Sequence, residues 1–357
     1  MARISLIMPV YNAEKTLDYS VDSVFKQTED DFEFIAVNDG SIDDSLKKLE
    51  ELKSKSKIEF KIIDKPNGGA ASARKVGLEK STGDIIGFID SDDIIDKDYL
   101  KNMYDTLYST NTNICCSRMA IHLDNPLLKN IPLKNKRRRL KYDALKDRKI
   151  VPIMNVVTNG KLFKREYIDI TNKDFVANED LSKNYYLYAK ARNISFANDV
   201  TYHYMPNGDG LVSNNIFGYT WDRIKNTLLP LTELKNTFEN GFIFEDYYYE
   251  VEQLFIKNIF DRVNYISKNV PDCEDKDLLI NILYDYISYH FPNWQENPYL
   301  LTHFKDFEIP DTISTFQNSS RVSNYKPISY ESEDEIYSNY EAISKRIQKK
   351  SKTRSLW

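Results

Sequence analysis

Residues 84–93 read DIIGFIDSDD, an apolar run that ends in three closely spaced aspartates. The apolar part is short and continuous, which is typical of a strand that is buried on both faces of a sheet. Asp90, Asp92 and Asp93 then follow within four positions, and like charges placed this close repel one another. Such an arrangement calls for either open solvent or a bound cation at the end of this strand.

Similar apolar runs precede this strand, and each is followed by a helical pattern. Strands are expected at 3–10, 32–37 and 58–63, with helices after each of them. A helix at 97–109 and a strand at 112–120 continue the alternation. Apolar strands that alternate with helices predict an α/β fold, with a mainly parallel sheet covered by helices on both faces.

Polar residues stand directly after four of these strands. They are Asn12, Asp39, Asn67 and the acids of 90–93. In an open parallel sheet, ligands bind outside the carboxyl ends of the strands. The pattern therefore predicts a binding site at this edge of the sheet. Asn12 is also expected to cap the helix that follows it.

The acids themselves fit a divalent cation. The pattern Asp-Ser-Asp puts the carboxylates of Asp90 and Asp92 on one side of an extended backbone. Mn²⁺ and Mg²⁺ prefer such oxygen ligands, together with those of a diphosphate. The alternative is a solvated turn in which Asp93 or Asp96 caps the next helix. For Asp96 and Asp98, a place in the first turn of helix 97–109 is the favoured interpretation.

The composition is that of an ordinary globular protein. The chain has 357 residues, 41% of them hydrophobic, and a net charge of -5, which is too small to argue for or against a nucleic-acid partner. No nucleic-acid partner is expected. Its three cysteines have no disulfide or zinc spacing, which favours a reducing compartment. The apolar run at the N-terminus is too short for a signal peptide. These features predict a cytoplasmic location.

Two parts of the chain differ in character. Residues 1–217 carry the α/β pattern, with a basic excursion at 122–150, and residues 218–357 are expected to be mainly helical. The basic run 136–139 could bind a phosphate-bearing acceptor or a lipid headgroup, although a solvated loop is slightly favoured. The basic tail after 345 has the composition of a peripheral membrane anchor, of a disordered end or of a contact with a second subunit.

An ordered series of motifs now narrows the interpretation. The motifs are MPVYNAEKTLDYSVDSVFKQT, VNDGSIDDS, KPNGGAASARKVGL, GDIIGFIDSDD and ANEDL, spread over about residues 3–215. In order and spacing this series resembles glycosyltransferase family 2, whose members have the GT-A fold. The resemblance implies an inverting, metal-dependent enzyme that moves a hexosyl or N-acetylhexosaminyl group from a nucleotide sugar, commonly UDP-linked, to a hydroxyl of a glycan, wall polymer, lipid-linked or glycoprotein acceptor.

The resemblance also implies which residues bind the base. Pro9 and Tyr11 would line the base pocket, and Asp39 would accept a hydrogen bond from the uracil imide. Asn67 and Gly68 would let the backbone approach the nucleotide. Taken without the resemblance, Asp39 suits an Asx-type turn and Asn67-Gly68 suits a simple turn.

The diphosphate side is implied in the same way. Arg74 would reach the base or the phosphates, although alone it suits a surface arginine. Asp90 would hold the ribose side next to Ser91 and would also be a metal ligand. Asp92, alone or together with Asp93, would bind the metal and the diphosphate. His203 would be a third metal ligand or a phosphate contact, and a packed histidine is its alternative.

The acceptor side depends on Glu179 and Asp180. In the family resemblance, Asp180 would be the general base that takes the proton of the acceptor hydroxyl, and Glu179 would orient it. Alone, an acid at the start of a helix is often only an N-cap. Residues 206–213 would form a lid over the diphosphate.

Two rival functions stay open at this point. A sugar-1-phosphate nucleotidyltransferase would share the sheet and the metal, but MPVYNAEKT lacks the Gly-rich basic loop expected after its first strand. A scaffold that binds a nucleotide sugar without turnover is the rival that is not an enzyme. Intact Asp92 and Asp180 argue against it.

Overall fold

The computed structural model describes residues 3–122, 131–132, 141–154, 156–168, 179–205, 219–302 and 329–354. The chain divides into two compact units, Met1–Gly210 and Leu211–Trp357. The basic run 136–139 and the expected boundary after residue 217 lie outside the described residues, and so do the side chains of the basic tail from 349 onward.

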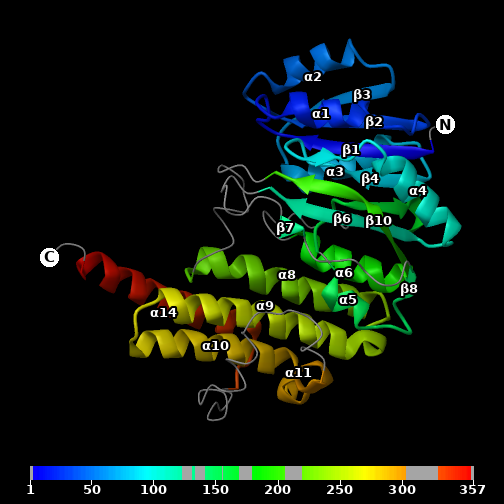
Figure 1. Cartoon of the computed structure of the whole chain (residues 1–357). Coiled ribbons are helices and arrows are strands. Elements are labelled where there is room, and N and C mark those ends of the chain that lie inside the picture. The colour runs from blue at the N-terminus through cyan, green and yellow to red at the C-terminus, as the bar shows by residue number, and fades with distance from the viewer. Residues whose placement is uncertain are drawn as a thin grey trace. The chain divides into compact units, whose positions relative to one another are not determined.

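The first unit is built on one sheet (Figure 1). Its strands are β1 (Ile4–Val10), β2 (Phe32–Asp39), β3 (Glu59–Lys65), β4 (Ile85–Phe88), β5 (Ile94–Ile95), β6 (Ile114–Ile121), β7 (Ile131–Pro132), β8 (Lys141–Asp143), β9 (Lys161–Lys164) and β10 (Asn193–Tyr204). Its helices are α1 (Leu17–Phe25), α2 (Ser45–Lys53), α3 (Gly69–Lys80), α4 (Tyr99–Ser109), α5 (Ile150–Ile153) and α6 (Glu179–Ala191).

The order of the strands explains where polar groups gather. The main path of the sheet is β3-β2-β1-β4-β9-β6-β10-β5. Strand β1 pairs in parallel with β2 and β4, and β2 pairs in parallel with β3. Strand β9 lies antiparallel between β4 and β6, while β6 and β10 are parallel. The first four strands therefore end at one common edge, which confirms the mainly parallel sheet.

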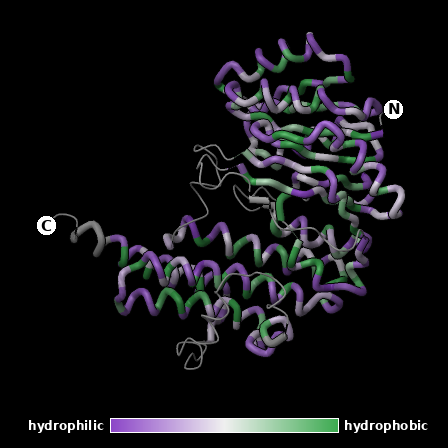
Figure 2. The backbone as a smooth tube through the Cα atoms, viewed as in Figure 1, coloured by the Kyte–Doolittle hydropathy of each residue, from purple (hydrophilic) through white to green (hydrophobic). Residues whose placement is uncertain are grey.

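Both faces of the sheet are covered by helices. Side chains alternate along a strand, so Ile4, Leu6, Met8 and Val10 share one face of β1. They belong to the same buried cluster as apolar residues of α1 and α4. Ile7 points to the other face, where a Cβ added at Gly77 of α3 would lie only 2.4 Å from its Cγ2. Figure 2 shows the hydrophobic residues concentrated along these strands.

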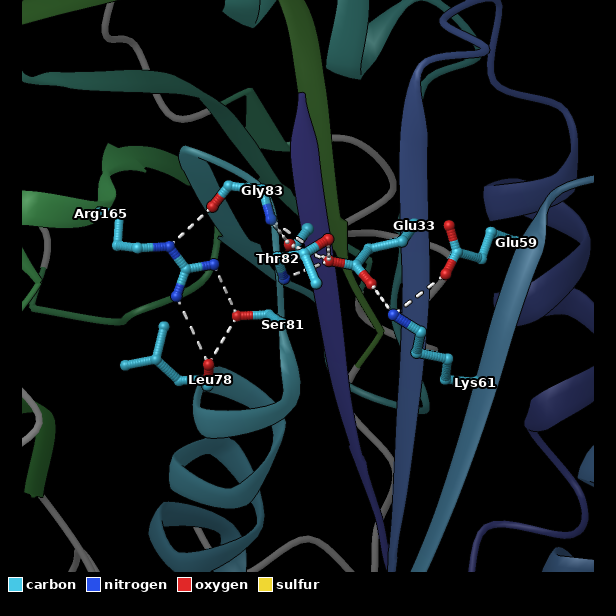
Figure 3. Close-up of polar contacts among 9 residues, drawn as sticks. Glu33, Glu59, Lys61, Leu78, Ser81, Thr82, Gly83 and Arg165 are labelled. Atoms are coloured by element: carbon cyan, nitrogen blue, oxygen red, sulfur yellow. Dashed lines mark hydrogen bonds and ion pairs between the residues drawn. The ribbon is translucent and has the colours of Figure 1, made fainter. Parts of the chain in front are cut away.

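A buried acid, Glu33, lies near the amino ends of the parallel strands, opposite the edge where the polar groups gather (Figure 3). Glu33, at the start of β2, is completely buried. Its carboxylate accepts hydrogen bonds from Ser5 Oγ at 2.6 Å, from the Thr82 backbone N–H at 2.5 Å and from Lys61 Nζ at 2.5 Å. Burial alone raises the pKa of Glu33, but these bonds outweigh it and hold the pKa at about 2.

Arg165 also holds the turn beside Glu33 by hydrogen bonds. Arg165 donates from Nε to the Gly83 carbonyl at 2.8 Å and from Nη2 to Ser81 Oγ at 2.9 Å (Figure 3). These bonds fix the turn between α3 and β4 at both of its ends. Helix α3 and strand β4 are the elements that lead into the acidic edge, so this turn helps to set their positions.

The second unit is helical. It contains α8 (Trp221–Asn240), α9 (Tyr248–Asn269), α10 (Glu274–His290), α11 (Pro298–Thr302) and α14 (Glu333–Arg354). The apolar stripe that the sequence shows over 244–267 forms part of its core, with Val251, Leu254, Phe255 and Ile259 fully buried. No helix among the described residues is long and apolar enough to cross a membrane.

The cysteines behave as small apolar residues or surface groups. Cys115 and Cys116 are buried in β6, as their expected place in a strand indicates. Cys273 is exposed. All three are free thiols.

Candidate active site

Three carboxylates meet directly after β4. Oxygen atoms of Asp90, Asp92 and Asp93 lie within 4.8 Å of one another, and this is the one such group of three among the described residues. Asp93 is completely buried, and the other two are half-buried. The strand ends here because the segment turns back toward β5, with the Asp93 backbone N–H bonded to the Asp90 carbonyl at 3.2 Å.

Crowding changes the acidity of this group. Burial raises the pKa of Asp92 to about 6, and the charge of Asp90 adds to the effect. Burial, again with the charge of Asp90, raises the pKa of Asp93 to about 8. The ionised carboxylates of Asp90, Asp92 and Asp93 therefore repel one another, and a bound positive charge would reduce this repulsion.

The donor set fits a hard divalent cation. Carboxylate oxygens are the ligands that Mg²⁺ and Mn²⁺ prefer, and the ligands must be deprotonated to bind. Asp90, Asp92 and Asp93 are the residues that would hold such an ion. The turn brings Asp93 back beside Asp90, so the structure favours the alternative in which Asp93 acts together with Asp92.

Asp90 is clamped from two sides. Arg74 of α3, a buried side chain, donates from Nη2 to Oδ1 of Asp90 at 2.9 Å. Asn159, also buried, donates from Nδ2 to Oδ2 at 2.6 Å. Arg74 is therefore not a surface arginine. Asn159 was not expected from the sequence, because nothing in its local pattern marks it as close to Asp90.

Hydroxyl groups border the acids on the remaining sides. Tyr202 of β10 donates to Oδ2 of Asp93 at 2.5 Å, and Tyr19 of α1 donates to the Asp92 carbonyl at 3.2 Å. Burial, with the charges of Asp93, Asp92 and Asp90, raises the pKa of Tyr204. The tyrosines stay protonated donors beside the acids.

Asp39 organises a second loop at the same edge. Its carboxylate accepts hydrogen bonds from the backbone N–H of Gly68 at 3.0 Å and of Gly69 at 2.7 Å, and it pairs with Lys65. Its backbone carbonyl accepts from Asn67 Nδ2 at 3.0 Å. The structure therefore brings together Asp39, Asn67 and Gly68, as the sequence predicts, and it adds Lys65.

This loop approaches β2 very closely at Gly40. That residue has a φ of +68°, and a Cβ there would lie 2.6 Å from the Asn67 backbone nitrogen. Only glycine fits both demands. Asn38, the residue before Asp39, donates from Nδ2 to Asp64 Oδ1 at 2.7 Å.

The loop after β1 has an unexpected conformation. Asn12 does not cap α1, which begins at Leu17 after Thr16. Its φ is 49°, its Oδ1 accepts from the Ile42 backbone N–H at 2.9 Å, and its own N–H donates to Ser41 Oγ at 3.0 Å. Asparagine is one of the few residue types that adopt this left-handed backbone routinely. It joins the loops that follow β1 and β2.

Three further predicted binding residues differ in exposure. Pro9 is buried in β1 beside Val37 of β2, Tyr11 is 52% exposed just beyond the strand, and Ser91 is half-buried between Asp90 and Asp92. The ring of Tyr11, exposed to this extent at the carboxyl edge of the sheet, is available for stacking. Their roles with a nucleotide stay predictions.

His203 is engaged outside the three-carboxylate group. Its Nε2 lies 2.9 Å from Asp96 Oδ1, and its Nδ1 lies 2.8 Å from Nε2 of His122. The alternation of β10 turns His203 to the face opposite Tyr202, whose hydroxyl reaches Asp93. Its role as a metal ligand stays a prediction.

Asp96 and Asp98 have more specific contacts than a helix start requires. Asp96 accepts from the Thr201 backbone N–H at 2.8 Å and so holds β10. Asp98 stands at the N-cap position of α4 without a capping hydrogen bond, and it accepts from Thr28 Oγ1 at 2.9 Å. Because α4 begins at Tyr99, neither acid lies in its first turn, and the predicted place of both is wrong.

The acceptor side is only partly visible. Helix α6 begins at Glu179, followed by Asp180, but the side chains of both lie outside the described residues. The predicted lid at 206–213 lies outside them as well. Their roles stay predictions.

The comparisons with known proteins point to one family. Residues 5–170 match the family model described as Glycosyl transferase family 2. EpsH of Bacillus subtilis, named as a glycosyltransferase, is 30% identical over 211 residues, which is 56% of this chain and 60% of that protein. The cholesterol galactosyltransferase of Borreliella burgdorferi is 27% identical over 286 residues, which is 74% of this chain and 79% of that protein.

A solved structure supports the fold. The crystal structure of Staphylococcus aureus TarS residues 1–349 with UDP has a TM-score of 0.63 and 16% identity, and the match covers 98% of this chain and 92% of that one. The chain spans only 60%, 13% and 40% of the first curated relatives that it matches. The fold is the GT-A α/β fold that the sequence predicts, and residues 5–170 of the chain carry the sequence pattern of glycosyl transferase family 2.

Proposed function

We propose that this chain catalyses the metal-dependent, inverting transfer of a sugar from a nucleotide diphosphate to an acceptor hydroxyl. The observation that carries the proposal is the group of Asp90, Asp92 and Asp93 at the carboxyl edge of the sheet, with Asp90 held by Arg74. The Asp39 loop lies at the same edge, after β2. A cation site and a nucleotide loop at one sheet edge suit a nucleotide sugar.

The donor is proposed to be UDP-linked. TarS, which shares the fold, has been solved with UDP and with UDP-GlcNAc. In the proposed complex, Tyr11 stacks on the base above Pro9, and Asp39 accepts from the uracil imide. Because Asp39 already bonds Lys65, Gly68 and Gly69, its carboxylate is fixed in place before the nucleotide arrives.

The chemistry is assigned to the residues on either side of the sugar. Asp180 takes the proton of the acceptor hydroxyl while that oxygen forms its bond to the anomeric carbon and the bond from this carbon to the diphosphate oxygen breaks. Glu179 orients the acceptor. A bound Mn²⁺ or Mg²⁺ would supply positive charge beside the diphosphate. Asp90, fixed by Arg74, holds the ribose side so that the anomeric carbon faces the acceptor.

The acceptor is proposed as a hydroxyl-bearing glycan, wall polymer or lipid-linked molecule. The names of two relatives specify a sterol and a poly(ribitol-phosphate) as acceptors, both of which carry hydroxyl groups. A cytoplasmic location with a peripheral membrane contact would suit acceptors of this kind. This part of the proposal rests on the sequence and on the names of relatives.

Thermal stability against a panel of nucleotide sugars tests the donor site. The melting temperature would be measured with and without Mn²⁺ for wild type, Asp92→Ala and the control Asp105→Ala, which removes an exposed acid paired with Lys101. A ligand that binds the native state raises the midpoint. We expect a rise that needs both the metal and Asp92 and that Asp105→Ala retains. No rise with any nucleotide sugar at millimolar concentration would contradict the proposal.

Turnover separates the enzyme from the scaffold alternative. Release of UDP from the best donor would be followed with hydroxyl acceptors. Binding of the donor without UDP release from any acceptor would favour a scaffold. Transfer that is lost in Asp92→Ala would support the enzyme.

A further inference from the structure

Asn159 occupies a demanding place for an amide side chain. It is 6% exposed, and its Nδ2 donates to Asp90 Oδ2 at 2.6 Å, opposite the bond from Arg74. Because only the amide nitrogen can donate to a carboxylate, the orientation of the side chain is fixed. Its Oδ1 is then buried without a hydrogen-bond partner among the residues that the structure describes. A buried acceptor without a partner is costly, so this oxygen has an unused capacity to accept a hydrogen bond.

The loop that carries Asn159 is held by its own strand. Lys161, the first residue of β9, is 2% exposed, and its ammonium group donates to the backbone carbonyls of Val157 and, at 3.2 Å, Asn159. Gly160 has a φ of +74°, and its carbonyl accepts from the Ser117 backbone N–H at 2.9 Å. The loop thus turns sharply between fixed points, and Asn159 stands at its tip.

The same loop is also held by α6. Asn184, with 1% exposure, donates from Nδ2 to the Val156 carbonyl at 2.6 Å and to Thr158 Oγ1 at 3.1 Å. Asn184 lies one helical turn after the start of α6, where Glu179 and Asp180 stand. Asp90 is therefore connected to Asn184 through the hydrogen bond of Asn159, the backbone of loop 156–160 and the two hydrogen bonds of Asn184.

We propose that Asn159 is a donor-positioning residue, and that loop 156–160 is a strut that links the donor carboxylate Asp90 to helix α6. Asn159 fixes the carboxylate of Asp90 and offers its Oδ1 to a hydroxyl of the donor. Asn184 transmits the position of this strut to the helix that carries the proposed base. The inference rests on the proposed function, because it assigns Asp90 to donor binding.

Calorimetric titration with UDP in the presence of Mn²⁺ tests the strut. The proteins are wild type, Asn159→Ala, Asn184→Ala, the double variant and the control Asn102→Ala, which removes a hydrogen bond of 2.9 Å to Asp199. Ordering one freed side chain costs roughly 0.5–1.5 kcal/mol, so Asn159→Ala should weaken UDP binding about 2- to 12-fold. Asn102→Ala should bind as wild type does.

The two asparagines should act as one unit. Asn184→Ala should also weaken UDP binding, and the double variant should lose no more than about the larger single loss, because linked residues are not additive. Fully additive losses would overturn the link to α6. If Asn159→Ala does not fold, Asn184→Ala carries the test, and unchanged UDP affinity in it overturns the strut.

Failure of this inference is distinct from failure of the proposed function. Wild type that binds UDP with the same affinity as Asn159→Ala overturns the inference alone. Wild type that binds no UDP at any metal concentration overturns the proposed donor site, and the strut with it. The melting temperatures of the metal-free and UDP-free proteins, measured alongside, separate loss of positioning from loss of folding.

Discussion

The hydroxyl of Tyr202 donates a 2.5 Å hydrogen bond to Oδ2 of Asp93, and the hydroxyl oxygen of Tyr202 accepts from the Asp90 backbone N–H at 3.1 Å. One phenol therefore bridges the two ends of the acidic segment. Because Tyr202 is fully buried, this bridge is shielded from water and holds both aspartates in one arrangement.

Tyr202→Phe should lower both stability and metal-dependent UDP binding. Leaving a buried carboxyl and a buried N–H without this partner costs about 1–3 kcal/mol. The matched control is Tyr99→Phe, a buried tyrosine whose ring lies 6.5 Å from that of Tyr202. Chemical denaturation and UDP titration with Mn²⁺ measure the two effects. Equal UDP affinity in Tyr202→Phe and Tyr99→Phe would show that the bridge has no part in the site.

Asp180→Asn should reduce transfer without loss of donor binding. If Asp180 is the general base, turnover should fall by roughly 10²–10⁴. The matched control is Asp222→Asn, an acid in the first turn of α8 whose side chain is 83% exposed. Steady-state rates and UDP affinity would be measured together. A rate within a few-fold of wild type would contradict the assignment of the base.

Glu33→Gln should destabilise the first unit and change its response to acid. Removing the charge leaves Lys61 without its buried partner, at a cost of about 2–4 kcal/mol. The pKa of Glu33 is about 2 in the folded state and near 4.5 when it is exposed. Its stabilisation is therefore complete above about pH 4.5 and is lost as the pH falls toward 2.

Denaturation of wild type and Glu33→Gln at several pH values measures this effect. The difference in unfolding free energy between the two should shrink as the pH falls from 4.5 to 2. Glu59→Gln is the control, because Glu59 also pairs with Lys61 but is 56% exposed. A difference that does not change with pH would argue that the charge of Glu33 is not what stabilises the turn.

Gly40→Ala should be more damaging than Gly69→Ala. Both glycines have positive φ, +68° and +85°, so both alanines meet backbone strain of about 1–2 kcal/mol. Only at Gly40 does the new Cβ also collide with the Asn67 backbone nitrogen, whereas at Gly69 nothing lies within 4 Å. The melting temperature and UDP affinity of Gly40→Ala should both be lower. Equal losses in the two variants would mean that the loop shifts freely.

The sequence predicts the fold well where the signal is local. Each strand from β1 to β4 is a short apolar run followed by a polar residue, and parallel pairing then brings the strand ends to one edge. For this reason Asp39, Asn67 and Asp90 were expected at a common site. Local chemistry also predicts Gly68 in the turn before α3.

The missed residues are those that arrive from distant parts of the chain. Asn159 meets Asp90 from 69 residues away, and Tyr202 meets Asp93 from 109 residues away. Their positions depend on the antiparallel insertion of β9 and on the pairing of β10 with β6, which no short pattern encodes. Asn12 was misread for a related reason, because its partner, Ile42, belongs to the next strand loop.

The candidate site can be complete only after strand β10 has been synthesised, because Tyr202 and Met205 both bond Asp93. The ribosome releases the acids of 90–93 long before it releases Tyr202 and Met205, which donates from its backbone to Asp93 Oδ1 at 2.9 Å. Contacts between residues so far apart in sequence form late, after the local elements. A nascent chain that stops short of β10 therefore holds the acids of β4 without the groups that arrange them. The candidate cation site is therefore complete only near the end of the synthesis of the first unit.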